Sequence, residues 1–311
     1  MGRIKGRVKQ VFIIVNLIVF AVCLFLCYKM YQKYNENKQE KDKIVASYKE
    51  IMNDKELDDN KIKEINDKID ELNNIDTKIK NTRDEVYKLS GELEKKVKSG
   101  ESKKKIAYLT FDDGPYYNTY KVLKILKQNK VKATFFTTNV NKEKCYDNKN
   151  ANCHEVYAAI AKDNHTLANH TYTHGWNRGL YTNTNTFMDA IKKQENLIKE
   201  KTGVTTNIAR FPGGSSTPGA TKGKAMKKAL KEAGYGWVDW TASDGDGGSL
   251  PNYATGMKNF KGTINDKIEV VLFHDYHQVT TAMLPEVIKY LRDKNYIILP
   301  LFYESVMVNK G

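Results

Sequence analysis

Two adjacent carboxylates, Asp112 and Asp113, directly follow the apolar-alternating segment 105–111 and precede Gly114 and Pro115. Because side chains alternate along an extended chain, the two are predicted to point in different directions. Such a pair can divide its work, one carboxylate holding a metal ion and the other moving a proton. Asp and Gly also suit an ordinary turn, so the catalytic interpretation depends on partners elsewhere in the chain.

Two histidines four residues apart, His170 and His174, are candidate partners. On a helical turn, residues i and i+4 share a face, so both imidazoles could reach one metal ion. Taken alone, the spacing also fits two unrelated surface histidines. Together with Asp113 they make two nitrogen ligands and one oxygen ligand, the composition of an open catalytic zinc site. Cobalt or manganese would suit the same ligands.

Three further segments carry groups that could bind a ligand or transfer a proton. Arg210 can bind a carboxylate through two hydrogen bonds, and the Pro212-Gly-Gly turn lets a ligand approach the backbone closely. Asp246 lies in an Asp/Gly-rich loop that lacks the final glutamate of an EF-hand calcium loop. His274 ends a buried-type strand, where it is poised to donate a proton. Each segment also has a plain structural reading, as a loop or as a core histidine.

Apolar runs alternate with helical patterns after residue 104. The predicted strands are 106–111, 133–138, 166–168, 208–211, 235–238, 270–273 and 296–299. The predicted helices are 120–128, 154–163, 186–202, 222–233 and 281–294. This alternation predicts an α/β fold with a parallel sheet or barrel, whose site lies at the carboxyl ends of the strands.

In chain order, five segments resemble the five motifs of the polysaccharide deacetylases, carbohydrate esterase family four. They are Thr-Phe-Asp112-Asp113-Gly, His170-Thr-x-x-His174, Arg210-x-Pro212, the Asp246 loop and Leu272-x-His274. The resemblance spans residues 105–305 and looks closest to Gram-positive peptidoglycan N-acetylglucosamine deacetylases. It implies a distorted, incomplete (β/α) barrel and metal-dependent removal of acetyl groups from N-acetylated sugars.

The resemblance also implies a role for each matching residue. The metal ligands would be Asp113, His170 and His174. Asp112 would be the general base and His274 the general acid that protonates the leaving amine. Arg210 would orient Asp112, and Asp246 would tune His274. The acetate pocket would be formed by Pro212, Gly213, Trp240 and Leu272.

Two positions depart from the common pattern of that family. Gly213 stands where many members have an aromatic residue, and Gly247 stands where many have tryptophan after the aspartate of the fourth motif. We expect Trp240 or Trp237 to fill the second space from upstream. These departures affect the shape of the pocket rather than the reaction.

Residues 11–28 form an apolar run close to the roughly 20 residues that cross a bilayer. Basic residues precede the run, so the positive-inside rule places residues 1–10 in the cytoplasm and the rest of the chain outside. No small-x-small cleavage site follows, which favours an uncleaved anchor over a signal peptide. Residues 1–34 are therefore predicted to be a basic tail and a transmembrane anchor.

Residues 35–100 are polar, with apolar residues at steps of three and four. This pattern predicts a helical stalk or coiled coil. It would form a homodimer or hold residues 101–311, the predicted catalytic domain, away from the membrane. A partly disordered spacer is the alternative.

The chain of 311 residues has a formal net charge of +14, and residues 101–311 carry 30 basic and 20 acidic side chains. A basic domain favours an anionic partner. Nucleic acid and an anionic cell wall or membrane surface fit the charge equally well, and a solvated basic surface without a specific partner is the alternative. No nucleic-acid-binding motif is present, and no nucleic-acid partner is predicted. Cys145 and Cys153 could close a small loop as a disulfide in an exported segment, with two free thiols as the alternative.

These observations predict a membrane-anchored, extracellular peptidoglycan deacetylase acting on N-acetylglucosamine. The enzymatic alternatives are deacetylases of chitin oligomers, poly-N-acetylglucosamine, N-acetylmuramic acid or acetylated xylan. A non-catalytic wall-binding protein that retains the fold is the alternative from another class.

Overall fold

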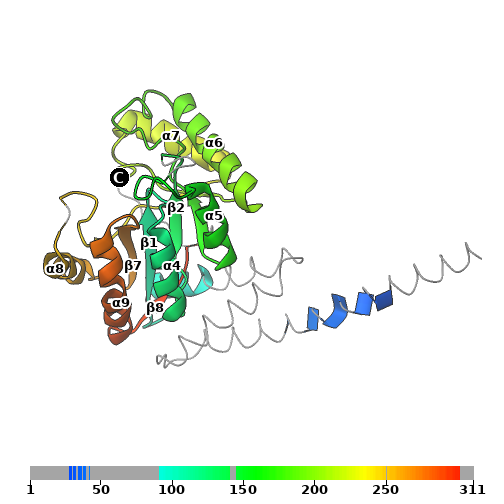
Figure 1. Cartoon of the computed structure of the whole chain (residues 1–311), viewed down its shortest axis with the longest axis vertical. Helices are drawn as coiled ribbons and strands as arrows, with labels where there is room; N and C mark the ends of the chain where they lie inside the picture. Colours follow the sequence, from blue (N-terminus) through cyan, green and yellow to red (C-terminus); the bar gives the residue numbers. More distant parts are fainter. Residues whose placement is uncertain are drawn as a thin grey trace, which may run out of the picture.

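The computed structural model describes residues 91–140, 145–249 and 251–301, together with short helical stretches between residues 28 and 42 (Figure 1). Almost all of the predicted anchor, residues 11–28, and most of the predicted stalk lie outside these ranges. Among the residues that the structure describes, no helix is long and apolar enough to cross a membrane. The predicted division into anchor, stalk and catalytic domain stays a prediction.

Eight strands form one curled sheet, and every paired strand is parallel to its neighbour. The sheet order is β5-β4-β3-β2-β1-β7-β6, with β8 also paired to β1. The strands are β1 (Lys105–Asp112), β2 (Thr134–Thr137), β3 (Thr166–Asn169), β4 (Ile208–Ala209), β5 (Gly236–Trp237), β6 (Ala242–Ser243), β7 (Ile268–His274) and β8 (Tyr296–Ile298).

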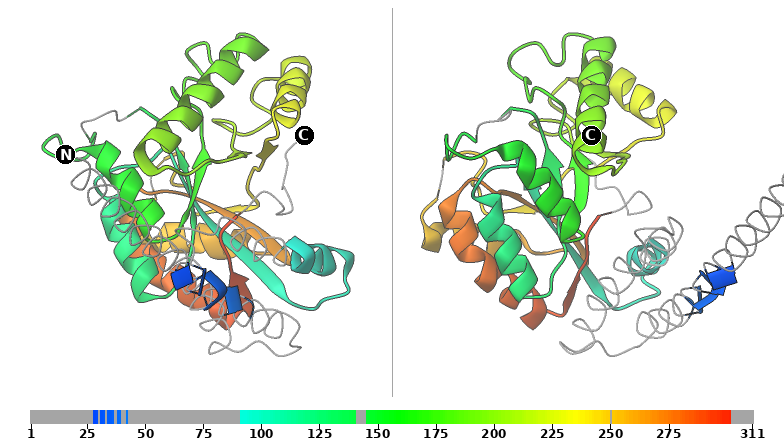
Figure 2. Two further views of the ribbon diagram at one scale, coloured as in Figure 1. Left: turned by 90° about the vertical axis from the view of Figure 1, so that its right-hand side faces the viewer. Right: turned by 45° about the vertical axis from the view of Figure 1, so that its right-hand side comes forward.

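Helices pack around the outside of the curled sheet (Figures 1 and 2). They are α4 (Thr119–Gln128), α5 (Cys153–Lys162), α6 (Thr184–Thr202), α7 (Ala220–Glu232), α8 (Tyr253–Thr263) and α9 (Gln278–Asp293). The edge strands β5 and β6 are joined only by residues 238–241. The sheet is therefore an incomplete barrel, as predicted, and the strand ends that carry the site face one opening.

Strand β1 pairs with three other strands, and its register positions the site. It pairs with β7 along seven residues, which places Asp112 opposite His274. Its amino-terminal half also pairs with β8, and its carboxyl-terminal half pairs with β2. Because β1, β2 and β7 run in the same direction and are paired up to Asp112, their carboxyl ends meet at one edge, whereas β8 ends beside Ala107.

The structure adds two elements that sequence patterns did not predict, β6 and α8. Two residues are too few for β6 to show a periodic pattern. Helix α8 contains Gly256 and Gly262, which disfavour helix. Its formation depends instead on burial of Met257 and Phe260 and on the Asn252 cap, which accepts a hydrogen bond from the Thr255 N–H at 2.9 Å.

Cys145 and Cys153 form a disulfide, with their Cα atoms 4.9 Å apart. The closed loop carries Asp147, whose carboxylate accepts hydrogen bonds from the backbone N–H groups of Tyr117 and Asn118 at 2.9 and 2.7 Å. These groups lie at the amino terminus of α4, where a carboxylate is favourable. The disulfide-closed loop is thus attached to the segment that follows the Asp112–Asp113 pair.

Replacement of Leu291 by alanine should lower the free energy of unfolding by about 2–5 kcal/mol, because the side chain is fully buried between α9 and the sheet. The exposed Lys289→Ala on the same helix is the control, with an expected change within about 0.5 kcal/mol. Denaturant unfolding of both variants measures the difference. Equal effects would contradict this assignment of the core.

Candidate active site

Asp112 and Asp113 lie at the carboxyl end of β1, but their side chains do not alternate in direction as they would along a strand. Asp112 is the last strand residue and is 3% exposed, whereas Asp113 has left the strand, with φ of 69°. Because that conformation is not extended, the prediction that the two side chains diverge is wrong. Both carboxylates approach His170, whose Nε2 lies 3.6 Å from Asp112 Oδ2 and 3.4 Å from Asp113 Oδ1.

His170 and His174 lie in the loop after β3, not on the helical turn that their spacing suggested. Thr171 and His174 have φ of 64° and 46°, a region that non-glycine residues seldom occupy. This turn brings the imidazole centroids to 4.9 Å from each other. The predicted convergence of the histidines is therefore confirmed, although its structural cause is different.

Asp113, His170 and His174 form a cluster that could hold a metal ion, with all three ligand atoms within 4.8 Å of one another. Asp113 Oδ1 is buried and has no hydrogen bond of good geometry to any residue that the structure describes. Its distances of 3.4 and 3.0 Å to the histidine Nε2 atoms are close to the ~3.3 Å between ligands of a tetrahedral ion with bonds of about 2.0–2.1 Å. The residues thus fit a divalent cation.

The surroundings favour the ligand forms of these side chains. His170 Nδ1 lies 2.9 Å from the carbonyl oxygen of Arg210 and donates to it, which leaves Nε2 as the atom that faces the cluster. Burial alone would raise the pKa of Asp113. The close polar contacts and charges of His170 and His174 outweigh burial and hold that pKa well below its usual range.

Arg210 is fully buried inside the sheet and links β1 to the segment between the two edge strands. Its guanidinium donates to the carbonyl oxygens of Val238 and Asp239 at 3.1 and 2.9 Å, to Thr110 Oγ1 at 2.8 Å, and to Asp112 Oδ1 at 2.7 Å. Arg210 therefore contacts Asp112, as predicted, but through one hydrogen bond rather than two. It fixes the carboxylate so that Oδ2 faces His170.

His274 ends β7, beside the cluster. Its Nδ1 lies 2.7 Å from Asp246 Oδ1, and its backbone N–H donates to Asp246 Oδ2 at 2.8 Å. Its Nε2 lies 3.8 Å from Asp113 Oδ2. Burial would lower the pKa of His274, but the hydrogen bond and charge of Asp246, with smaller contributions from Asp113 and Asp112, raise it to about 9. Asp246 therefore favours the protonated form of the imidazole.

Two predicted pocket residues, Pro212 and Gly213, follow Arg210 in the chain, and a third, Leu272, precedes His274. Leu272 is two residues before His274 on β7, so its side chain leaves the same face of the sheet. The carbonyl of Pro212 accepts a hydrogen bond from the Tyr181 hydroxyl at 2.8 Å. Gly213 is exposed, with φ of 76°.

Neither upstream tryptophan is placed beside Gly247. A Cβ atom on Gly247 would lie 2.8 Å from His274 Cε1, so the imidazole fills the space next to the glycine. The Trp240 ring instead lies against Gly214, where a Cβ atom would be 3.3 Å from the ring, and Trp237 packs in the cluster under α6 and α7. A side chain at position 247 would therefore collide with the imidazole of His274.

Sequence reasoning gave no role to two buried carboxylates that hold the site together, Asp239 and Asp275. Asp239 accepts from the Ser215 N–H and hydroxyl at 2.9 and 2.6 Å, which fixes the loop after Arg210. Asp275 contacts the Thr119 hydroxyl, and its carbonyl accepts from Asn118 Nδ2 at 2.8 Å. Direct adjacency of Asp275 to His274 is the signal that could have identified it.

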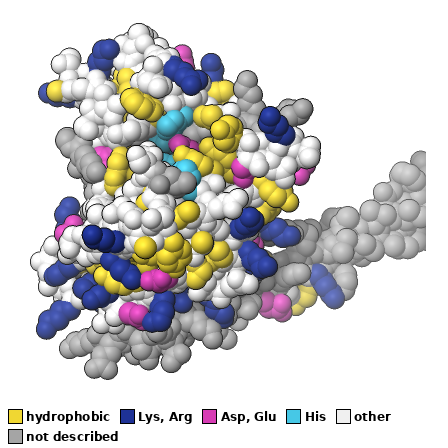
Figure 3. Space-filling model, turned by 60° about the vertical axis from the view of Figure 1, so that its left-hand side comes forward, with side chains coloured by type: hydrophobic (Ala, Val, Ile, Leu, Met, Phe, Trp, Pro, Cys, Tyr) yellow, Lys and Arg dark blue, Asp and Glu magenta, His cyan; other side chains and the backbone are white. Residues whose placement is uncertain are grey.

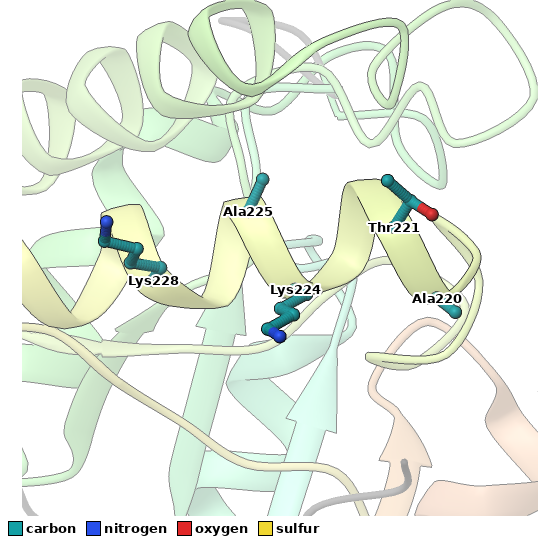
Figure 4. A pocket seen from close by; sticks show the side chains of 5 residues that line it. All are labelled: Ala220, Thr221, Lys224, Ala225 and Lys228. Carbon is teal, nitrogen blue, oxygen red and sulfur yellow. The ribbon is translucent and has the colours of Figure 1, made fainter.

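The face that carries the histidines also carries hydrophobic side chains around them (Figure 3). A separate open hollow of about 440 Å³ lies on the outer face of α7 and is lined by Ala220, Thr221, Lys224, Ala225 and Lys228. The two lysine side chains there point apart (Figure 4). This hollow contains none of the clustered ligands and is not the candidate active site.

An incomplete parallel α/β barrel with an Asp/His/His cluster at its strand ends defines the class of protein. A family model for polysaccharide deacetylase matches residues 99–238. The chain is 31% identical over 201 residues to a peptidoglycan-N-acetylglucosamine deacetylase of Bacillus cereus, covering 62% of this chain and 68% of the relative. It is 30% identical to the putative polysaccharide deacetylase YheN of Bacillus subtilis, covering 62% and 65%.

Solved structures agree with this assignment. The catalytic domain of a peptidoglycan N-acetylglucosamine deacetylase from Eubacterium rectale has a TM-score of 0.60 and 30% identity, over 67% of this chain and 93% of that one. The chain belongs to the polysaccharide deacetylase family. It is accordingly a hydrolase that acts on N-acetyl amide bonds, as predicted.

The ionisation of Asp275 should make the fold less stable as pH rises. Burial raises the pKa of this carboxyl to about 7, whereas an unfolded aspartate titrates near pH 3.9. Between those values the unfolded state releases its proton first, so stability falls. Asp275→Asn should remove this contribution, as measured by the free energy of unfolding at a series of pH values. An unchanged slope would contradict it.

The two adjacent aspartates should respond differently when each is replaced. Asp113→Asn should weaken zinc binding by more than about 100-fold, above the loss typical of an outer-shell partner. Asp112→Asn should leave zinc affinity within a few-fold of the wild type. Calorimetric titration of the metal-free protein gives both values. Comparable losses in the two variants would show that the carboxylates share the ligand role.

Proposed function

We propose that this chain is a metal-dependent deacetylase of peptidoglycan, removing the N-acetyl group of N-acetylglucosamine at the cell surface. The arrangement that carries the proposal places two proton-transfer groups around one candidate metal cluster. Asp112 Oδ2 lies 3.6 Å from Nε2 of His170, a member of the cluster. His274 Nε2 lies 3.8 Å from Oδ2 of Asp113, another member of the cluster.

The ion would be held by Asp113, His170 and His174, and zinc suits two imidazoles and one carboxylate. When bound, it would polarise the acetyl carbonyl and make water more acidic. Cobalt and manganese are alternatives that the same ligands accept.

Asp112 would act as the general base that takes the proton of the attacking water. Arg210, which donates to Asp112 Oδ1 at 2.7 Å, orients the carboxylate for that task. In the overall reaction, water adds to the acetyl carbon and the C–N bond breaks. Because an amide nitrogen is a poor leaving group, it must receive a proton as the bond breaks.

His274 would give that proton to the leaving sugar amine. Asp246 holds Nδ1 at 2.7 Å and so directs the Nε2 proton toward the cluster. The pocket for the acetyl methyl group would include Leu272 and Trp240, and the backbone of Pro212 and Gly213 would face the developing oxyanion.

The substrate and location rest on the relatives and on the N-terminal sequence. Two of the relatives carry the name peptidoglycan-N-acetylglucosamine deacetylase. Residues 11–28 would anchor the chain in the membrane, with residues 1–10 in the cytoplasm, and residues 35–100 would carry the basic catalytic domain into the wall, as a monomer or as a homodimer.

The purified, zinc-loaded protein should release acetate from peptidoglycan, and Asp112→Asn should lower the rate by about 100-fold or more while zinc stays bound. Mass spectrometry of the digested product should locate the lost acetyl group on N-acetylglucosamine. Loss from N-acetylmuramic acid, or release from chitin oligomers, poly-N-acetylglucosamine or acetylated xylan alone, would redirect the substrate assignment. No release from any of these glycans would overturn the proposed activity.

A further inference from the structure

A buried carboxylate outside the proposed catalytic set, Asp244, lies two residues before Asp246. Its side chain is fully buried, and its Oδ1 accepts a hydrogen bond from the Asp246 N–H at 3.1 Å. Its Oδ2 lies 3.2 Å from the hydroxyl oxygen of Thr280 on α9. The same hydroxyl lies 2.7 Å from Asp246 Oδ2. One hydroxyl therefore stands between two carboxylates.

If Asp244 and Asp246 are both ionised, the Thr280 hydroxyl lacks the protons to form a hydrogen bond with each of them. The Thr280 hydroxyl has a single hydrogen to donate, and its shorter contact is with Asp246. Asp244 Oδ2 would then face an oxygen without a proton between them. Two ionised carboxylates in a buried site also repel each other and lose their hydration. One proton on Asp244 removes both difficulties.

We propose that Asp244 is protonated and donates a hydrogen bond to Thr280 Oγ1, so that Thr280 donates to Asp246 and Asp246 remains ionised against His274. Asp244 and Thr280 are thereby positioning residues for the general acid. This inference rests on the proposed function only in giving His274 that role.

The electrostatics of the site agree with this hydrogen-bond order. Burial raises the pKa of Asp244 to about 7, and the charge of Asp246 acts in the same direction. A second negative charge behind Asp246 would make His274 hold its proton more tightly and weaken it as an acid. A neutral Asp244 keeps the orienting contact without adding that charge.

The first test compares two substrates that differ in their need for an acid. An N-acetylated glycan requires protonation of its leaving amine, whereas 4-nitrophenyl acetate has a leaving group that departs without it. Asp244→Ala and Thr280→Val should lower kcat on the glycan by about 10–100-fold, part of the usual contribution of a general acid. On 4-nitrophenyl acetate the change should stay within a few-fold.

Conservative variants separate the hydrogen-bond role from a packing role. Asp244→Asn offers an amide N–H to Thr280 and should retain most of the glycan activity, as should Thr280→Ser, which keeps the hydroxyl. Equal losses on both substrates, or losses in the conservative variants as large as in Asp244→Ala, would overturn the proposal.

The second test does not depend on turnover. At mildly acidic pH, the infrared spectrum of the wild type minus that of Asp244→Asn should show the carbonyl band of a protonated carboxyl group, with Asp275→Asn identifying the band of the other buried carboxyl. Absence of the Asp244 band would overturn the inference, whatever the enzyme hydrolyses. The band together with no acetate release from glycans would count against the proposed function and support the assignment of the proton.

Discussion

The buried guanidinium of Arg210 is the interaction on which the rest of the site depends. A buried cation is costly unless its donors are satisfied. This one is satisfied by the Val238 and Asp239 carbonyls, by Thr110 and by Asp112. Its Cζ also lies 4.1 Å from the centroid of Phe136, where the ring face favours a cation.

These contacts tie together parts of the chain that are distant in sequence. The Val238 and Asp239 carbonyls belong to the segment between the two edge strands, so the guanidinium stabilises the place where the barrel is open. The carbonyl of Arg210 itself orients His170 through Nδ1. Arg210 thus holds the candidate base and one candidate metal ligand, and it links both to the segment between the edge strands.

The opposite side of the site is held by hydrogen bonds between buried acidic and hydroxyl groups. Asp246 fixes His274 through both its imidazole and its backbone N–H. Asn118 and Thr119 join the turn after Asp113 to Asp275. Gly114 permits this approach, because a Cβ atom there would lie 2.7 Å from Asp275 Oδ2. The proposed base, metal ligands and acid are consequently held by hydrogen bonds from neighbouring loops.

The amino-acid sequence by itself determined the family, the parallel α/β class and the residues that meet at the site. It could do so because strand ends in a parallel sheet share one edge, and Asp112, Arg210 and His274 each occupy or adjoin such an end. Local pattern did not determine how the ligands converge. Asp113 and His174 depend on left-handed backbone conformations that alternation and helical spacing do not anticipate.

Only the tertiary structure decided the contacts of the buried polar groups. The hydroxyl of Thr280 and the carboxylates of Asp244 and Asp246 come from a loop and a helix more than 30 residues apart. The distances between the hydroxyl and the two carboxylates determine how many protons these three side chains need. No sequence pattern encodes a distance between remote segments. The same holds for Gly247, whose missing side chain is explained only by the imidazole of His274 beside it.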